Sequence, residues 1–405
     1  MRENDKRVVD RFTELALVDG ESFNERLVAD YLIAEFQKLG IKLIEDDIAG
    51  KIGGNCGNLY GFAEGRGKYA DSEPILFCAH MDTVSPGSNK KIILNDGGTI
   101  TSDHTTVLGA DDRVGIAGII EAYTRVIEEN LDHPPIEFLF TVAEEVYGLG
   151  SAALDYSRIR SRIAFAPDCS GEYGVYSSCE PTLISFEVHI KGKASHAGYE
   201  PEKGINAIAV AAAAISRIKQ GWADDHTTLN IGIIEGGSVT NAVPENCFIK
   251  GEIRSGVHED AHRTIDLVES IFSEEANRAG AELCIDKKER ITVYRIDPEA
   301  AEGSALDRYK RALEKQGRRA VAKKSFGGSD INSLIKHGMD GLNIYGPMHN
   351  IHTTEEYTTV QEIADFTELI KILMTTMRNN LKAFALFGKP HHKVPVLGSR
   401  EKEMV

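Results

Sequence analysis

Hydrophobic and polar positions follow one pattern in the outer parts of this chain and another in its middle. Near the N-terminus, residues 41–44, 58–62 and 75–79 are short strand-like runs, and residues 136–142 have the unbroken hydrophobicity of a strand buried on both faces. Residues 114–129, between two of these runs, are typical of a helix. Strands that alternate with helices in this way predict an α/β sheet.

The first helix of this region has a recognisable start and end. Ser22 and Glu25 have the spacing of a capping box ahead of an apolar-periodic segment, and Gly40 follows the last apolar position. The sequence therefore predicts a helix that begins after Ser22 and ends before Gly40.

In the middle of the chain, residues 182–190 alternate as a strand exposed on one face does. Helical and strand-like segments then follow in the order β-α-β-β-α-β, which is the split βαβ arrangement: 182–190, 203–219, 228–234, 247–254, 259–278 and 282–289. Because this unit is complete by itself, we expect it to be a separate domain inserted into the first.

Alternating helices and strands resume after the insertion, at 304–316, 330–337, 341–344 and 360–381, and the polar tail at 389–405 is expected to be loose. The predicted fold class is α/β. A main domain, residues 1–180 and 297–405, has a mixed, mostly parallel sheet flanked by helices. An inserted α+β domain of split βαβ type, residues 181–296, is a lid or dimerisation domain.

Composition and charge narrow the classes of function. The 405 residues include 46 Lys and Arg against 62 Asp and Glu, a net charge of −16, which argues against a nucleic-acid binder or a binder of anionic membranes. The longest apolar run, 207–215, is too short for a membrane span of about 20 residues. The N-terminus has no signal-peptide core, and the six cysteines form no CxxC pair, so we expect a cytoplasmic protein with reduced thiols.

Chemistry is concentrated in five segments that carry metal-ligand residue types at strand ends or in loops. They contain His80 and Asp82, Asp111, Glu144 and Glu145, Asp168, and His352. Each has an ordinary alternative: a surface histidine with a turn aspartate, a helix N-cap, or an exposed pair of glutamates. In open α/β sheets, however, the ligand site lies beyond the carboxyl ends of the strands, where several of these residues fall.

Taken together, the segments supply imidazoles and carboxylates but no thiolate. This donor set suits Zn²⁺, Mn²⁺ or Co²⁺. Two histidines and several carboxylates can hold two ions about 3.5–4 Å apart, with one carboxylate bridging them. The sequence therefore predicts two divalent metal ions, with zinc preferred.

The motifs that carry these residues resemble the dinuclear zinc exopeptidases of the peptidase T type, a family that also contains glutamate carboxypeptidase, aminoacylase and succinyl-diaminopimelate desuccinylase relatives. The resemblance runs from about residue 5 to 385 with the motifs in the family's order. They are AHMDTV, GADDRVGIA, AEEVYGLGS, Asp168, KASHAGYEPEKGINAI, GGSD and NIHTTEEY.

The resemblance implies a role for each matching residue. His80 and Asp168 would hold one metal, Glu145 and His352 the other, and Asp111 would bridge both. Asp82 would orient the His80 imidazole, and Glu144 would be the general base and acid for the attacking water. The residues expected to contact substrate are His196, Asn241, Arg254, Gly328 and Ser329. Ser329 stands where the family's Gly-Gly-Thr-Asp motif has threonine, which keeps the hydroxyl. In some dimeric relatives the histidine at the position of His196 comes from the partner subunit, so a homodimer is possible.

Three functions are compatible with these features. The first is an exopeptidase for short peptides, in particular a tripeptide aminopeptidase, whose partners are small peptides. The second is an N-acyl-amino-acid amidohydrolase or dipeptidase on the same scaffold. The third is a metal-dependent binding protein without turnover, for which the presence of Glu144 is unfavourable.

Arg254 is a further open case. It shares a strand face with Glu252, so it could form an ordinary ion pair on a solvated sheet. The resemblance instead places it near a substrate carboxylate, which a guanidinium can bind through two parallel hydrogen bonds.

Overall fold

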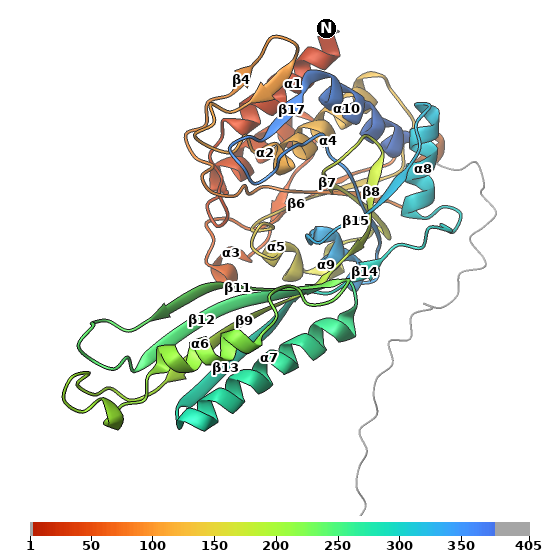
Figure 1. Ribbon diagram of the computed structural model, residues 1–405. Coiled ribbons are helices and arrows are strands. Elements are labelled where there is room, and N and C mark those ends of the chain that lie inside the picture. Colours follow the sequence, from red (N-terminus) through yellow and green to blue (C-terminus); the bar gives the residue numbers. More distant parts are fainter. Residues whose placement is uncertain (1–2, 377–405) are drawn as a thin grey trace, which may run out of the picture.

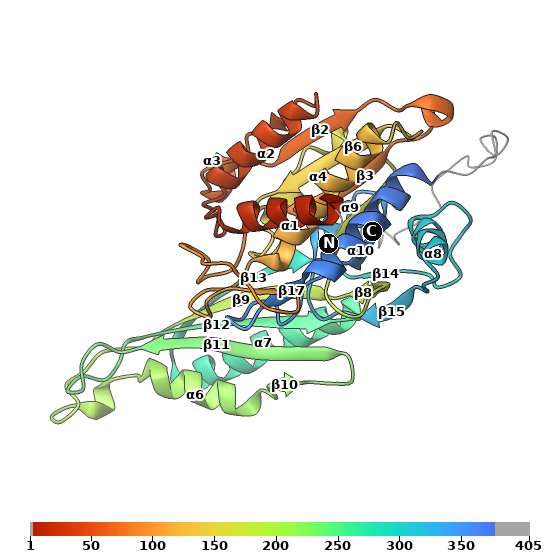
Figure 2. The same ribbon diagram turned by 90° about the horizontal axis from the view of Figure 1, so that it is seen from above.

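The computed structural model describes residues 3–376, whose strands form a nine-stranded, a five-stranded and a three-stranded sheet. Figures 1 and 2 show an elongated unit, residues 181–296, that projects from the remaining residues. We call it the lid and call residues 3–180 and 297–376 the body. The last strand of the projecting range, β14 (Tyr294–Arg295), pairs with β8 and is counted with the body. The exact domain boundaries stay a prediction. Among the described residues, no helix is long and apolar enough to cross a membrane. The predicted loose tail at 389–405 lies outside the described residues.

The large sheet organises the body. Its strands run in the order β1-β2-β6-β3-β7-β16-β8-β14, and β15 also pairs with β8. The central strands β6, β3, β7 and β16 are parallel, as predicted. The strands are β1 (Ile44–Glu45), β2 (Leu59–Ala63), β3 (Ile75–His80), β6 (Ile136–Thr141), β7 (Ile163–Cys169), β8 (Val175–Glu180), β14 (Tyr294–Arg295), β15 (Val321–Lys324) and β16 (Asp340–Tyr345).

Helices cover both faces of this sheet, which explains why its strands lack polar alternation. In β3, Ile75, Phe77 and Ala79 join the core beneath α2, α4, α8 and α10, whereas Leu76 and Cys78 join a second core beneath α9. The body helices are α1 (Glu3–Ala16), α2 (Arg26–Lys38), α3 (Ala49–Ile52), α4 (Ala110–Glu128), α5 (Leu149–Ala152), α8 (Ala305–Lys315), α9 (Asp330–Lys336) and α10 (Val360–Thr375), with 3₁₀ turns at Gly67–Tyr69 and Tyr156–Arg158.

The lid is the predicted split βαβ unit. Its strands lie in the order β10-β11-β12-β9-β13, and every neighbouring pair is antiparallel. Helices α6 and α7 pack on one face and close a core of its own. Its elements are β9 (Thr182–Lys191), a 3₁₀ turn at Pro201–Lys203, α6 (Ala207–Arg217), β10 (Gly221–Trp222), β11 (Thr227–Gly236), β12 (Asn246–Ser255), α7 (His258–Ala279) and β13 (Glu282–Ile291).

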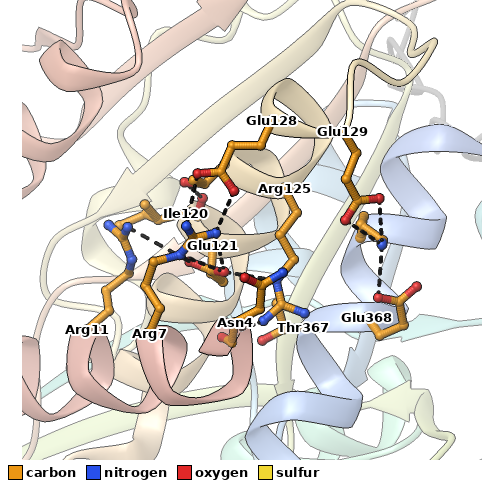
Figure 3. A network of polar contacts seen from close by, with 12 residues as sticks. Asn4, Arg7, Arg11, Ile120, Glu121, Arg125, Glu128, Glu129, Thr367 and Glu368 are labelled. Carbon is orange, nitrogen blue, oxygen red and sulfur yellow. Dashed lines mark hydrogen bonds and ion pairs between the residues drawn. The ribbon is translucent and has the colours of Figure 1, made fainter. Parts of the chain in front are cut away.

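A network of charged side chains joins the N-terminal helix α1 to helix α4 within the body (Figure 3). Arg7 of α1 donates to Glu121 and Glu128 of α4, and Arg125 bonds both Glu121 and the carbonyl of Asn4. Glu121 is fully buried, so these guanidinium groups supply the charge that a buried carboxylate requires. The sequence analysis gave no bounds for α1, where charged residues are frequent.

Two local predictions were wrong. Ser22 does not cap α2: its hydroxyl donates to Asp82, while Glu25 accepts the amides of Phe23 and Ala143. The strand expected at 41–44 is reduced to Ile44–Glu45.

A small sheet of β4 (Ile93–Leu94), β5 (Thr99–Thr101) and β17 (Tyr357–Thr359) was not foreseen. It brings the segment after residue 350 beside the start of α4.

Candidate metal centre

Asp111 lies at the centre of the predicted ligand cluster. Its Oδ1 is 3.0 Å from Nε2 of His80, and its Oδ2 is 3.2 Å from Nε2 of His352. Each oxygen of this carboxylate therefore faces a different imidazole. His80 ends strand β3, and Asp111 stands at the beginning of α4, before the regular part of the helix.

Two overlapping groups of donor atoms share Asp111. One consists of His80, Asp111 and Asp168, and the other of Asp111, Glu145 and His352; the donor atoms within each group lie within 4.8 Å of one another. His352 Nε2 is 2.9 Å from Oε2 of Glu145. Residues from three strand ends, a helix start and a distant loop thus meet in one place.

Asp82 holds three parts of the cluster together. Its two carboxylate oxygens accept the backbone amides of Glu144 and Glu145 at 3.0 and 3.1 Å, and the hydroxyl of Ser22 donates to it. Its backbone carbonyl is 3.0 Å from Nδ1 of His80, and its Oδ1 is 3.5 Å from the same nitrogen. One buried aspartate thereby orients a histidine and fixes the backbone that carries both glutamates.

Burial and like charge strongly affect the carboxylates. Burial raises the pKa of Glu144 well above its usual value, and nearby carboxylates, Asp330 and Glu145 among them, add to the rise. Burial and the charge of Asp111 raise the pKa values of Glu145 and Asp168 in the same way. Like charges in a buried site oppose one another's ionisation.

The histidines respond in the opposite direction. Hydrogen bonds to Asp111 and Glu145 raise the pKa of His352 to about 10. Burial would lower the pKa of His80, but Asp111 and Asp82 outweigh it and raise the pKa well above the usual value. Burial would raise the pKa of Asp111, yet its bonds with His352 and His80 hold it below the usual range. The cluster therefore has a surplus of negative charge that protons or metal cations must balance.

The donor set fits divalent metal ions. Imidazole nitrogens and carboxylate oxygens form two groups of three donors that share Asp111. The carboxylates oppose one another's ionisation unless a cation is close. A pair of cations in these two groups would satisfy both the geometry and the charge.

Glu356 is a site residue that the sequence analysis missed. Its carboxylate accepts the amide of Gly109 at 2.7 Å and that of Asp111 at 3.0 Å, so it fixes the turn that presents Asp111. Burial raises the pKa of Glu356 to about 7, with the charge of Asp111 adding to the rise. The residue lies in the NIHTTEEY motif, which was the available signal, but its partner is remote in the sequence.

Gly328 and Ser329 lie where the body meets the lid. A Cβ atom at Gly328 would stand 2.3 Å from Cδ1 of Ile291 at the end of β13, so a larger residue there would have to displace that side chain. The hydroxyl of Ser329 donates to the buried carboxylate of Glu180. In this structure the serine is thus part of a polar network inside the body.

Arg254 connects the lid to the loop before Gly328. Its Nε donates to Glu252 at 2.7 Å and its Nη1 to the carbonyl of Phe326 at 2.9 Å. The ion pair with Glu252, the ordinary alternative in the sequence analysis, is therefore present. The second bond shows that the same guanidinium also reaches the body.

His196 and Asn241 are far from this junction. Strand β9 starts beside the body at Thr182 and extends for ten residues, about 33 Å at the usual rise per residue, before the loop that contains His196. The contacts of His196 are with Gly198, Tyr199 and Ala242, and the carbonyl of Asn241 accepts the amide of Ala197. The structure joins these two residues to each other at the lid tip and not to the cluster around Asp111.

Sequence profiles of known families match two parts of the chain. The profile of a peptidase dimerisation domain matches residues 180–279, and the profile of peptidase family M28 matches residues 58–174. The first range covers most of the lid, and the second contains His80, Asp111 and Glu145.

Individual relatives match along nearly the whole chain. The uncharacterised protein YqjE of Bacillus subtilis strain 168 is 36% identical over 369 residues, which is 91% of this chain and 97% of that one. The aminopeptidase PepT of Bacillus cereus is 35% identical with a TM-score of 0.81, covering 92% of this chain and 98% of its own. A tripeptidase of Staphylococcus aureus is 29% identical with a TM-score of 0.84, at the same coverage.

Proposed function

Because the chain belongs to the M20/M28 family of dinuclear metallopeptidases, we propose that it is an exopeptidase for short peptides, specifically a tripeptide aminopeptidase. The observation that carries this proposal is the likeness, over nearly the full chain, to an aminopeptidase PepT and to a tripeptidase. The cluster around Asp111 supports hydrolysis of a peptide bond as the reaction.

We assign the ligands by the two groups that share Asp111. His80 and Asp168 would hold one ion, Glu145 and His352 would hold the other, and Asp111, which belongs to both groups, would be shared between them. We propose zinc, with manganese or cobalt as substitutes, because the donors are imidazoles and carboxylates. When bound, two such ions polarise the scissile carbonyl and increase the acidity of the attacking water.

Glu144 transfers the proton in this proposal. Its carboxylate accepts a proton from water as the water oxygen bonds to the peptide carbon, and it returns that proton to the amine nitrogen when the C–N bond breaks. Asp82 keeps Glu144 in place through the backbone amide.

The lid and the loop around Gly328 bind the substrate. Arg254 offers its guanidinium to the free C-terminal carboxylate of a short peptide, exchanging its bonds with Glu252 and Phe326 for that contact. Closure of the lid over the substrate would exclude water from the site.

We further propose that the protein acts as a homodimer in which His196 of one copy serves the site of the other. The dimerisation-domain profile over the lid supports the dimer. The position of His196 beyond the far end of β9 supports action between copies, since the residue stands at the lid tip.

A panel of four substrates tests the reaction. Purified protein with added Zn²⁺, Mn²⁺ or Co²⁺ is given a dipeptide, a tripeptide, the N-acetylated tripeptide and an N-acyl amino acid. A tripeptide aminopeptidase cleaves the free tripeptide fastest and fails on the acetylated one. Faster hydrolysis of the acyl amino acid or dipeptide would identify the amidohydrolase or dipeptidase instead, and no turnover of any substrate would contradict a peptidase.

A complementation experiment tests the role of His196. Glu144→Gln and His196→Ala are inactive or weak alone, but a mixed dimer would combine the intact Glu144 of one chain with the intact His196 of the other. Activity restored on mixing and refolding the two variants supports action between copies. Activity no greater than the sum of the separate variants contradicts it.

A further inference from the structure

A second group of metal-ligand residues lies in the lid, away from the cluster around Asp111. His258 and His262 stand one turn apart on α7, and Glu289 lies opposite them near the end of β13. Their ring nitrogens and carboxylate oxygen all lie within 4.8 Å of one another. We propose that His258, His262 and Glu289 form a third metal site, which takes a divalent transition-metal ion such as Zn²⁺ at the base of the lid.

The spacing of the donors suits such an ion. Oε2 of Glu289 is 3.1 Å from Nε2 of His262 and 4.0 Å from Nε2 of His258. A tetrahedral ion with ligands at about 2.0–2.1 Å separates neighbouring donors by about 3.3 Å, which lies between these two distances. Histidines four residues apart on a helix present their rings on the same face, and the two ring centroids here are 4.6 Å apart.

Outer contacts already orient two of the three ligands. Thr182 Oγ1 is 3.0 Å from Nδ1 of His258, and it also accepts the amide of Val293. When Nδ1 donates to this hydroxyl, the lone pair of Nε2 is available for a metal. Thr292 donates to Oε1 of Glu289, which leaves Oε2 between the histidines.

The chemistry of the group distinguishes it from a general cation site. Two imidazoles and a carboxylate select Zn²⁺, Co²⁺, Ni²⁺ or Cu²⁺ over Mg²⁺ and Ca²⁺, which prefer oxygen donors. The side chains of His258, His262 and Glu289 are 38%, 46% and 28% exposed, so an ion has access and water can supply the remaining position. The carboxylate also supplies negative charge near the positive end of α7.

The group of His258, His262 and Glu289 lies at the end of the lid that is next to the body. Thr182 and Val293 belong to the two segments through which the chain enters and leaves the lid, and Figure 1 shows the start of α7 near β14 and α9 of the body. An ion held by α7 and β13 would tie these two lid elements together at the end of the lid that lies next to the body. This inference does not rest on the proposed peptidase specificity.

The first experiment counts metal ions in the full-length protein. Protein stripped by a chelator is equilibrated with excess Zn²⁺, freed of unbound metal and analysed by plasma emission. We expect three ions per chain in the wild type and two in His262→Gln. The matched control, His226→Gln, removes a histidine from another lid group, with Asp224 and Asp260, and should retain three.

The second experiment isolates the lid site. In Asp111→Ala, whose fold is checked by circular dichroism, Co²⁺ is titrated and followed by visible absorption. We expect one site with a Kd that rises at least about 100-fold when His262→Gln is added and about 10–100-fold when Thr182→Val is added. A wild-type chain that binds two ions, or a third ion that survives His262→Gln, would overturn the proposal, as would no Co²⁺ spectrum in folded Asp111→Ala.

Discussion

The body and the lid use charged residues in opposite ways. Around Asp111 in the body, carboxylates are buried next to one another, and their pKa values are shifted by burial and like charge. On the open face of the lid sheet, half-exposed charges stand in opposite pairs, such as Lys250 with Glu187 at 3.0 Å. The first arrangement is costly without a bound cation, whereas the second needs nothing further.

The two kinds of charged group should respond differently to substitution. A buried carboxylate that repels its neighbours destabilises the folded chain unless a cation or a proton compensates it. An exposed pair contributes little, and its loss should affect little beyond local packing. The following substitutions test this contrast, from the largest expected effect to the smallest.

Glu144→Gln should have the largest effect on activity. The amide cannot accept a proton from water, so turnover should fall by about 10²–10⁴-fold while the two ions of the cluster around Asp111 stay bound. Single-turnover rates and metal analysis on the same sample would show this. Glu187→Gln in the lid is the control and should leave turnover unchanged. Near-normal turnover of Glu144→Gln with its metals bound would refute the proton-transfer role.

Removal of Asp111 should weaken the binding of both catalytic ions, whereas removal of His352 should weaken mainly one. Each lost ligand should raise the affected Kd by more than the factor of about 10–100 that outer contacts are worth. Metal content after gel filtration of Asp111→Ala and His352→Ala gives the comparison. A fully active wild-type protein with a single ion near Asp111 would contradict the shared carboxylate.

Arg254 tests whether a lid charge can take part in chemistry. If it binds the C-terminal carboxylate of the substrate, Arg254→Ala should lower kcat/KM by about 10- to 150-fold, the equivalent of about 1.5–3 kcal/mol. Amidation of the peptide should cause a similar loss in the wild type and little further loss in the variant. Unchanged kinetics in Arg254→Ala would leave only its ion pair with Glu252.

Lys250→Ala should have the smallest effect. Lys250 pairs with Glu187 on the half-exposed face of the lid, so the free energy of unfolding should fall by at most about 1 kcal/mol. Urea denaturation measures this change, and kcat/KM should stay at the wild-type value. A loss of several kcal/mol would mean that the open face of the lid is covered in the functional assembly.

The sequence predicted what depends on short segments of chain. The buried strand at 75–80 ends in a histidine, and that local pattern was sufficient to place His80 at the end of a strand. The β-α-β-β-α-β order of the lid could be predicted for the same reason, because each element has its own periodicity.

What the sequence did not reveal depends on distant partners. Ser22 and Glu25 have the spacing of a capping box, but their side chains bond to distant partners instead. The Ser22 hydroxyl donates to Asp82, and Glu25 accepts the amide of Ala143. The hydrogen bonds from the amides of Gly109 and Asp111 to the Glu356 carboxylate likewise join segments far apart in the sequence. The lid-tip location of His196 depends on the direction of β9, which runs away from the body, and local sequence does not specify that direction.

Because β9 is long, a small rotation at the base of the lid produces a large displacement at its tip. Its ten residues form an arm of about 33 Å between the base at Thr182 and the loop that carries His196. A rotation of only about 10° at the base displaces the end of such an arm by about 6 Å, roughly twice a hydrogen-bond length. If His196 serves the site of a partner copy, as proposed, a small rotation at the base of the lid would decide whether its imidazole reaches the substrate.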